Sequence, residues 1–248
     1  LQQFTTYLSG LLRGDLGPSI RQTEHSVAEL IGEAFPYSFL LGGAAMLLAL
    51  LLGVGAGTAA ALRQGSLLDR TITGLSLTGI SRPVFVVAPV LVLLFAVKLQ
   101  WLPAGWASDR GIATWVLPVV TLALPQLAYI ARLTRASMID VLASDFVRTA
   151  RAQGLGTATI VRVHALKPAM LPVMSYLGPA IAGILTGSVV VEQVFGLPGM
   201  GEMFVRSALN RDFTVVLGVV VFYAALIIAL NLLVDILYGV IDPRVRYR

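Results

Sequence analysis

Charged residues are scarce in this sequence, and cysteine is absent. Of the 248 residues, 57% are hydrophobic and only 12% are charged, whereas a soluble domain usually carries about 25% charged residues. The lack of cysteine excludes disulfides and thiolate chemistry, so the compartment cannot be inferred from redox. Since there is too little polar surface to cover a soluble fold, the composition predicts a membrane protein.

A phosphate-binding loop with its lysine, Gly-x4-Gly-Lys-Ser/Thr, is also absent. The glycine-rich "GLPGMG" at 196–201 follows no predicted strand, and we interpret it as a turn. The net charge of +5 comes without a basic patch interleaved with aromatic residues. This balance favours contact with lipid headgroups or a protein partner over nucleic acid.

Five windows are long and apolar enough to cross a bilayer, which takes about 20 residues. They cover approximately residues 35–62, 72–97, 114–130, 170–191 and 215–238. Because five buried core helices of this kind would be unusual in one soluble chain, we expect an all-α membrane protein with five transmembrane helices.

The arginines and lysines predict which side each connecting segment occupies. If the connecting segments alternate sides of the membrane, the loop 131–169 and the end of the chain share one side. Eleven of the eighteen basic residues lie on that side, so it is predicted to be cytoplasmic. An external start without a signal-peptide pattern indicates a further helix ahead of Leu1. The predicted domains are an external segment 1–34, a transmembrane domain 35–241 that includes the cytoplasmic loop 131–169 and an external loop 192–213, and a cytoplasmic tail 242–248.

Small and polar residues within the spans indicate where helices meet. Gly53 and Gly57 are four apart, as are Gly183 and Gly187, and this spacing predicts close helix contacts. Polar groups at membrane depth usually face protein or a water-filled cavity. Four of them are candidates for lining a transport pathway: Ser81, Arg82, Gln126 and Ser175. Because Arg82 precedes a proline, the helix is expected to break there.

The segment from 137 to 169 is a polar, basic insert between apolar windows. We expect a helix over 137–153, ended by a left-handed cap at Gly154 and restarted at Thr157. Its predicted apolar stripe consists of Met138, Val141, Leu142, Phe146, Thr149 and Ala150. Such a two-helix elbow suits docking on a protein or lying on lipid, and the residues alone leave both open.

The stretch "RTARAQG…HALKPA", residues 148–169, resembles the cytoplasmic signature loop of membrane subunits of ATP-binding-cassette (ABC) importers. In that family Glu-Ala-Ala is followed by three residues, Gly, nine residues, and Ile-x-Leu-Pro. Here Ala150 matches the second alanine, Gly154 the glycine, His164 the isoleucine position and Leu166 the leucine. The sequence departs from the pattern at Arg148, Thr149 and Lys167. These departures are typical of the dipeptide, oligopeptide and nickel branch.

Three further stretches resemble the same branch: "GLLRGDLGPS" at 10–19, "VEQVFGLPGMGEMFVRSALNRDF" at 191–213 and "DPRVRY" at 242–247. The resemblance therefore covers nearly the whole chain. It implies the type I ABC importer permease fold, which normally has six spans, so the helix expected ahead of Leu1 would be the first.

The resemblance implies a membrane-spanning subunit that forms half of the pathway for di- or oligopeptides in an ATP-driven importer of the inner or plasma membrane. Its expected partners are membrane lipid, a second homologous permease subunit in a heterodimer, two ATP-binding-cassette subunits and an external, periplasmic solute-binding protein. ATP and Mg²⁺ would bind the cassette subunits, which leaves this chain non-catalytic and without a cofactor of its own. The implied ATPase-coupling residues are Ser144, Asp145, Arg148, Thr149, Ala150, Arg151, Ala152, Gly154, Gly156 and His164.

Three alternatives remain open at this point. The same machine could import nickel, glutathione or another small solute. A secondary transporter would need a chain of buried coupling carboxylates, which the sequence does not show. If the chain were a structural anchor, mutation of the loop would affect assembly only and leave transport intact. No metal site is expected, because His25 and His164 fall on opposite sides of the predicted membrane.

Overall fold

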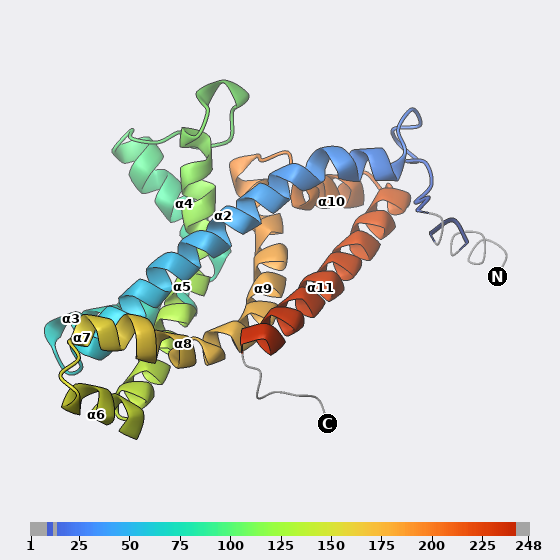
Figure 1. The fold of residues 1–248 in the computed structure, drawn as a ribbon. Coiled ribbons are helices and arrows are strands. Elements are labelled where there is room, and N and C mark those ends of the chain that lie inside the picture. Colours follow the sequence, from blue (N-terminus) through green and yellow to red (C-terminus); the bar gives the residue numbers. More distant parts are fainter. Residues whose placement is uncertain (1–8, 12–13, 242–248) are drawn as a thin grey trace. The chain divides into compact units, whose positions relative to one another are not determined.

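The computed structural model describes residues 9–11 and 14–241, without the side chains of 186, 237, 238, 240 and 241, and this part is almost wholly helical (Figure 1). The predicted tail 242–248 lies outside the described residues. The helices in chain order are α2 (Val27–Leu62), α3 (Leu67–Ser81), α4 (Val84–Leu91), the π-helix η1 (Val92–Lys98), the 3₁₀-helix η2 (Ser108–Arg110), α5 (Ala113–Leu142), α6 (Asp145–Ala152), α7 (Thr157–Thr159), the π-helix η3 (Ile160–Ala165), α8 (Leu166–Ala169), α9 (Leu171–Phe195), α10 (Met200–Leu209) and α11 (Phe213–Ile241).

Four helices, α2, α5, α9 and α11, are each long and apolar enough to cross a membrane. Helix α3 together with α4 and η1 provides a fifth, broken span among the described residues. The break is at Arg82, which has extended backbone angles (φ −101°, ψ 123°), and at Pro83, which has no backbone N–H to donate. The five predicted windows and the predicted break are thus confirmed.

The chain folds as two compact units, which are described separately. The first unit comprises Leu1–Gly43, Val84–Thr121 and Ile184–Ala229, and the second comprises Ala44–Pro83, Leu122–Gly183 and Leu230–Arg248. The segments predicted to be external all belong to the first unit. The loop 131–169, predicted to be cytoplasmic, belongs to the second.

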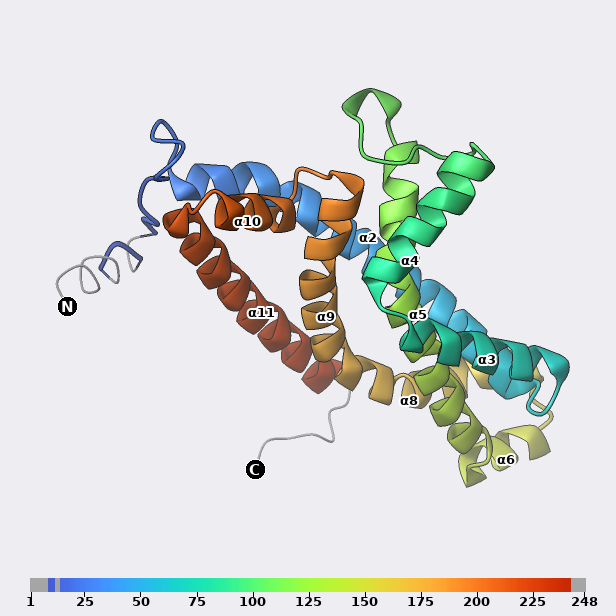
Figure 2. The same cartoon turned by 180° about the vertical axis from the view of Figure 1, so that it is seen from behind.

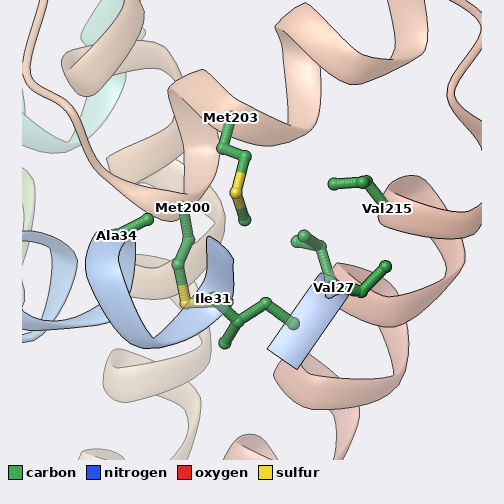
Figure 3. Packing of buried hydrophobic residues seen from close by; sticks show 7 residues of the cluster. Val27, Ile31, Ala34, Met200, Met203 and Val215 are labelled. Atoms are coloured by element: carbon green, nitrogen blue, oxygen red, sulfur yellow. The ribbon is translucent and has the colours of Figure 1, made fainter. Parts of the chain in front are cut away.

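The first unit has an apolar core in which α10 packs against the first turns of α2 and the start of α11 (Figure 3). Figures 1 and 2 both show α10 beside the start of α2. The core residues are Val27, Ile31, Ala34, Met200, Met203, Val215 and Val219. Within the predicted external loop 192–213, these contacts fix the helix α10 to two of the spans, while residues 192–195 belong to α9.

A buried carboxylate ties the chain ahead of α2 to the turn between α10 and α11. Asp212 is 3% exposed and accepts hydrogen bonds from the Ser19 hydroxyl and from the backbone N–H groups of Ile20 and Arg21. Burial raises the pKa of Asp212, but the hydrogen bonds from Ser19, Thr214 and these amides outweigh it, so the pKa lies below its ordinary value. The ionised carboxylate therefore stabilises this connection.

In the second unit, α2 meets α5 through glycines, as the spacing of Gly53 and Gly57 predicted. A Cβ at Gly53 would lie 2.9 Å from Ile130 Cγ2, and a Cβ at Gly57 would collide with the carbonyl oxygen of Ala131. Lipid supplies no hydrophobic drive between helices, so such close approach of two backbones is what holds them together.

We predict that Gly57→Ala destabilises the protein by about 1–3 kcal/mol, because the added methyl group overpacks a contact with backbone atoms that cannot move aside. Gly55→Ala is the matched control, because a Cβ at Gly55 meets no atom within 4 Å. Thermal unfolding in detergent checks both. Equal melting temperatures for the two variants would contradict the contact.

A second prediction concerns pH. Because the folded pKa of Asp212 is lowered, its stabilising effect is present above the unfolded value of about 3.9 and is lost as the pH falls through the folded value. Asp212→Asn should reduce the hydrogen-exchange protection of the Ile20 and Arg21 amides at pH 7, and the wild-type protein should approach this state in acid. Glu24→Gln, at an exposed position in the same segment, should leave the protection unchanged at either pH.

Candidate functional site

The polar insert folds into an elbow, which we define as α6, the turn that follows it, α7 and η3; all of them lie in the second unit (Figure 1). Helix α5 ends at Leu142, and the Ser144 hydroxyl donates a hydrogen bond back to the Val141 carbonyl oxygen at 2.5 Å. Ser144 itself is extended (φ −70°, ψ 157°), and α6 starts after it. The expectation of one continuous helix over 137–153 is therefore wrong, because the chain changes direction at Ser144.

The bend in the elbow is a glycine-based helix cap. Gly154 has a left-handed φ of 81°. The Leu155 N–H donates to the Ala150 carbonyl at 3.2 Å, and the Gly154 N–H donates to the Arg151 carbonyl at 3.0 Å. This pair of bonds is the Schellman motif. The predicted cap at Gly154 and restart at Thr157 are confirmed, with Gly156 preceding the new helix.

The elbow has a small apolar core of its own. Val147 and Ala150 of α6 pack with Ile160 of η3, and Leu142 at the end of α5 packs against them. The predicted apolar stripe is therefore only partly right. Ala150 is buried, but Phe146 is 47% exposed and Thr149 is also exposed, whereas Val147 is fully buried. The break at Ser144 starts a new helix, so its buried face does not continue the stripe of α5.

The predicted coupling residues divide by exposure. The exposed ones are Asp145, Arg148, Thr149, Arg151, Ala152, Gly154 and Gly156, while Ser144 and His164 are half-buried and Ala150 is buried. Arg148 Nη1 donates to Asp145 Oδ1 at 3.3 Å on the surface, where an ion pair contributes little to stability. Phe146 is the exposed large apolar side chain of α6, and the rest of the elbow adds Leu155 and Val163. Phe146 was not among the predicted site residues. The sequence signal that could have identified Phe146 is that it is an aromatic residue with charged residues close by on either side.

The predicted pathway residues fall at two places in the second unit. Ser81 and Arg82 are exposed at the helix break. Gln126 of α5 accepts a hydrogen bond from the Tyr176 hydroxyl at 2.7 Å, and Tyr176 stacks on Tyr129 with ring centroids 4.1 Å apart. This contact joins α5 to α9 and adds two aromatic residues that sequence reasoning missed.

Ser175, the fourth predicted pathway residue, is exposed on α9 next to Tyr176. Its hydroxyl donates to the Leu171 carbonyl oxygen at 3.2 Å. This local bond satisfies the hydroxyl within its own helix.

One carboxylate of the predicted external loop 192–213 is buried within the first unit. Glu192 of α9 is 0% exposed and accepts hydrogen bonds from the Ser38 hydroxyl at 2.8 Å and from the Gly201 N–H at 2.6 Å. A weaker bond from the Glu202 N–H adds to these at 3.3 Å. The carboxylate thus caps the N-terminus of α10, where the helix dipole favours a negative charge. With both oxygens engaged, it acts as a structural cap.

Comparison with known families identifies the chain. Residues 49–247 match the family described as "Binding-protein-dependent transport system inner membrane component". The chain belongs to this family. The match contains the whole elbow and four of the five spans, the broken one included, together with the last part of α2.

Similar proteins from this family are named as peptide permeases. The chain is 51% identical to the oligopeptide transport system permease protein OppB of Escherichia coli (strain K12) over 247 residues, which is 100% of this chain and 81% of OppB. It is 43% identical to the dipeptide transport system permease protein DppB of Bacillus subtilis (strain 168), covering 98% of this chain and 79% of DppB. The predicted dipeptide and oligopeptide branch is confirmed.

Solved structures show the same fold. A chain of the inward-facing MetNI methionine ABC transporter matches with a TM-score of 0.72 at 15% identity, covering 86% of this chain and 96% of that one. A chain of an amino acid ABC transporter crystallised with histidines matches with a TM-score of 0.63 at 18% identity, covering 85% and 93%. The predicted type I ABC importer permease fold is confirmed.

We predict that Gly154→Ala loosens the elbow without unfolding the rest of the chain. A residue with a Cβ costs roughly 1–2 kcal/mol in the left-handed conformation, and this cost falls on the α6 cap alone. Hydrogen exchange should be faster at the Leu155 N–H and unchanged in α9. Gly156→Ala is the control, since Gly156 has an ordinary φ of −68° and open space around it. Equal exchange in both variants would contradict the cap.

Proposed function

We propose that the chain is the membrane-spanning subunit of an ATP-driven importer and forms half of its pathway for di- or oligopeptides. The observation that carries the proposal is the elbow, a separately packed pair of short helices with an exposed aromatic residue, in a chain 51% identical to OppB over nearly its whole length. Peptides are favoured over nickel or glutathione because the relatives at 51% and 43% identity are named as oligopeptide and dipeptide permeases.

The elbow is proposed to dock on an ATP-binding-cassette subunit. A helix that lies on lipid needs several large apolar residues on one outward face, but α6 buries Val147 inside the elbow and exposes Phe146 alone among charged neighbours. The other exposed apolar residues of the elbow, Leu155 and Val163, lie outside this helix. A single aromatic anchor ringed by charges is typical of a protein interface. The other docking residues would be the exposed ones of α6 and its turn.

The remaining partners follow from this arrangement. A second, homologous permease subunit would complete the pathway as a heterodimer, and two cassette subunits would bind and hydrolyse ATP with Mg²⁺, so this chain holds no cofactor and performs no catalysis. An external solute-binding protein would deliver peptide to the segments 1–34, 99–112 and 192–213, which are assigned to the first unit.

We propose that the loop 131–169 and the C-terminus face the cytoplasm of a multi-pass inner-membrane protein. The excess of arginine and lysine in these segments supports this orientation. The division into units adds support, because every segment assigned to the outside falls in one unit and the loop falls in the other.

The pathway is proposed to be lined by polar residues of α5, α9 and the helix break. Ser81, Arg82 and Ser175 are exposed and polar, and Gln126 lies beside the tyrosine pair. Such groups are costly against lipid and suit a water-filled route. A proton- or ion-driven carrier fits less well, because the buried Glu192 is occupied by the α10 amides and Ser38.

We predict that Phe146→Glu leaves the protein folded and in the membrane but lowers its affinity for the cassette subunit by about tenfold or more, as expected for an aromatic anchor. Peptide uptake into proteoliposomes should fall in parallel. Copurification of the cassette subunit and uptake by the reconstituted complex measure the two effects.

Two further variants sharpen this test. Ala150→Glu places a charge in the elbow core and should abolish both docking and uptake. Leu67→Glu changes a leucine that is exposed at the start of α3, outside the elbow, and should change neither. Wild-type uptake with Phe146→Glu would refute docking through this face.

A further inference from the structure

A partly buried ion pair joins α3 to α5 outside the elbow. Asp69, in the first turn of α3, is 3% exposed. Arg135 of α5 donates to it through two nitrogens, Nε to Oδ1 and Nη2 to Oδ2, the latter at 2.8 Å. A bidentate pair of this kind fixes orientation as well as distance. Figure 2 shows α3 and α5 of this unit from behind.

The same carboxylate also organises the turn between α2 and α3. The Gly65 N–H donates to Asp69 Oδ2 at 2.9 Å, and the Asp69 N–H donates to the Ser66 hydroxyl at 3.3 Å. Asp69 is therefore part of the helix cap and of the ion pair at once. A displacement of Arg135 would move the start of α3 and not merely its side chain.

Arg135 lies at a point where α2 and α5 approach closely in the second unit. A Cβ at Gly57 of α2 would lie 3.0 Å from the Arg135 backbone nitrogen. One turn further along α5, Met138 packs with Ala61 of α2 and Val161 of η3. The stretch of α5 around Arg135 is thus in continuous contact with the C-terminal end of α2 and with the elbow. A displacement of the elbow is therefore transmitted to Arg135.

Helix α3 contacts α5 at a second point. A Cβ at Gly79 would lie 2.9 Å from the Ala128 Cβ. Asp69 and Gly79 are about 15 Å apart along α3, so the helix is attached near both ends, once by charge and once by close packing. The Asp69–Arg135 pair is the attachment nearer to the elbow in sequence and in contacts.

We propose that the Asp69–Arg135 pair is a second coupling point, which makes α3 follow α5 when the cassette subunit moves the elbow. Both are positioning residues, since neither is assigned a contact with ATP or peptide. The proposal rests on the proposed docking of the elbow. It extends the coupling machinery from the elbow to the first half of the broken span.

The test uses the complete complex in proteoliposomes, with both permease subunits, the cassette subunits and the binding protein. Asp69→Asn and Arg135→Gln should leave the complex assembled but raise the ATP hydrolysed per peptide imported by about fivefold or more, the scale of typical coupling energies. The double variant should be no worse than the worse single one, because the two residues act as one unit. Arg70→Gln, an exposed neighbour in α3, should match the wild type.

A distance measurement separates coupling from simple stabilisation. Because the chain has no cysteine, spin labels can be placed at introduced cysteines, Arg70→Cys on α3 and Thr159→Cys on α7, an exposed position of the elbow outside the proposed docking face. The distance between the labels should stay constant between the nucleotide-free and ATP-trapped states of the otherwise wild-type chain. With Asp69→Asn it should change or broaden on trapping.

The outcomes distinguish this inference from the proposed function. If Phe146→Glu fails to weaken cassette binding, the proposed docking is wrong. If docking holds but Asp69→Asn keeps the wild-type ratio of ATP to peptide and a constant label distance, the ion pair is only structural and the inference is overturned. Loss of assembled complex in both single variants would likewise assign the pair a structural role.

Discussion

The second unit depends on helix α5, because lipid offers neither hydrogen bonds nor a hydrophobic drive to hold helices together. Helix α5 makes a close backbone contact with Gly57 of α2, packs Ala128 closely against Gly79 of α3, and forms one ion pair through Arg135. Its last residue, Leu142, also packs into the elbow core. One helix thus carries both the contacts that stabilise the unit and the site at which a partner would act on it.

The spans and the elbow bend could be predicted from sequence because their causes are local. Length and apolarity mark a membrane helix whatever its neighbours are, Pro83 removes a donor wherever it stands, and Gly154 takes the left-handed cap without strain. Which face of α6 is buried could not be predicted in the same way. It depends on the Ser144 hydroxyl bonding back to Val141, and serine has several such local choices.

The site was predicted less completely because its members depend on tertiary contacts. One partner of Glu192 is Ser38, 154 positions away, so the burial and the capping role of this carboxylate could not be predicted from the sequence. Phe146 had been assigned to a buried stripe, and only the break before α6 turns it outward. The residues named from the resemblance lie together in and next to the elbow, because a short motif with fixed spacing belongs to one continuous stretch of chain.

The cap on α10 has a consequence for how the protein is made. A carboxylate leaves water at a cost of several kcal/mol unless its partners are already in place, and two of the partners of Glu192 are amides that follow it by nine and ten residues. During biogenesis the end of α9 cannot settle until Gly201 and Glu202 have emerged and begun to coil. Residues 192–202 must therefore mature as one cooperative step, and the C-terminal end of α9 acquires its final surroundings only after the chain beyond it has been made.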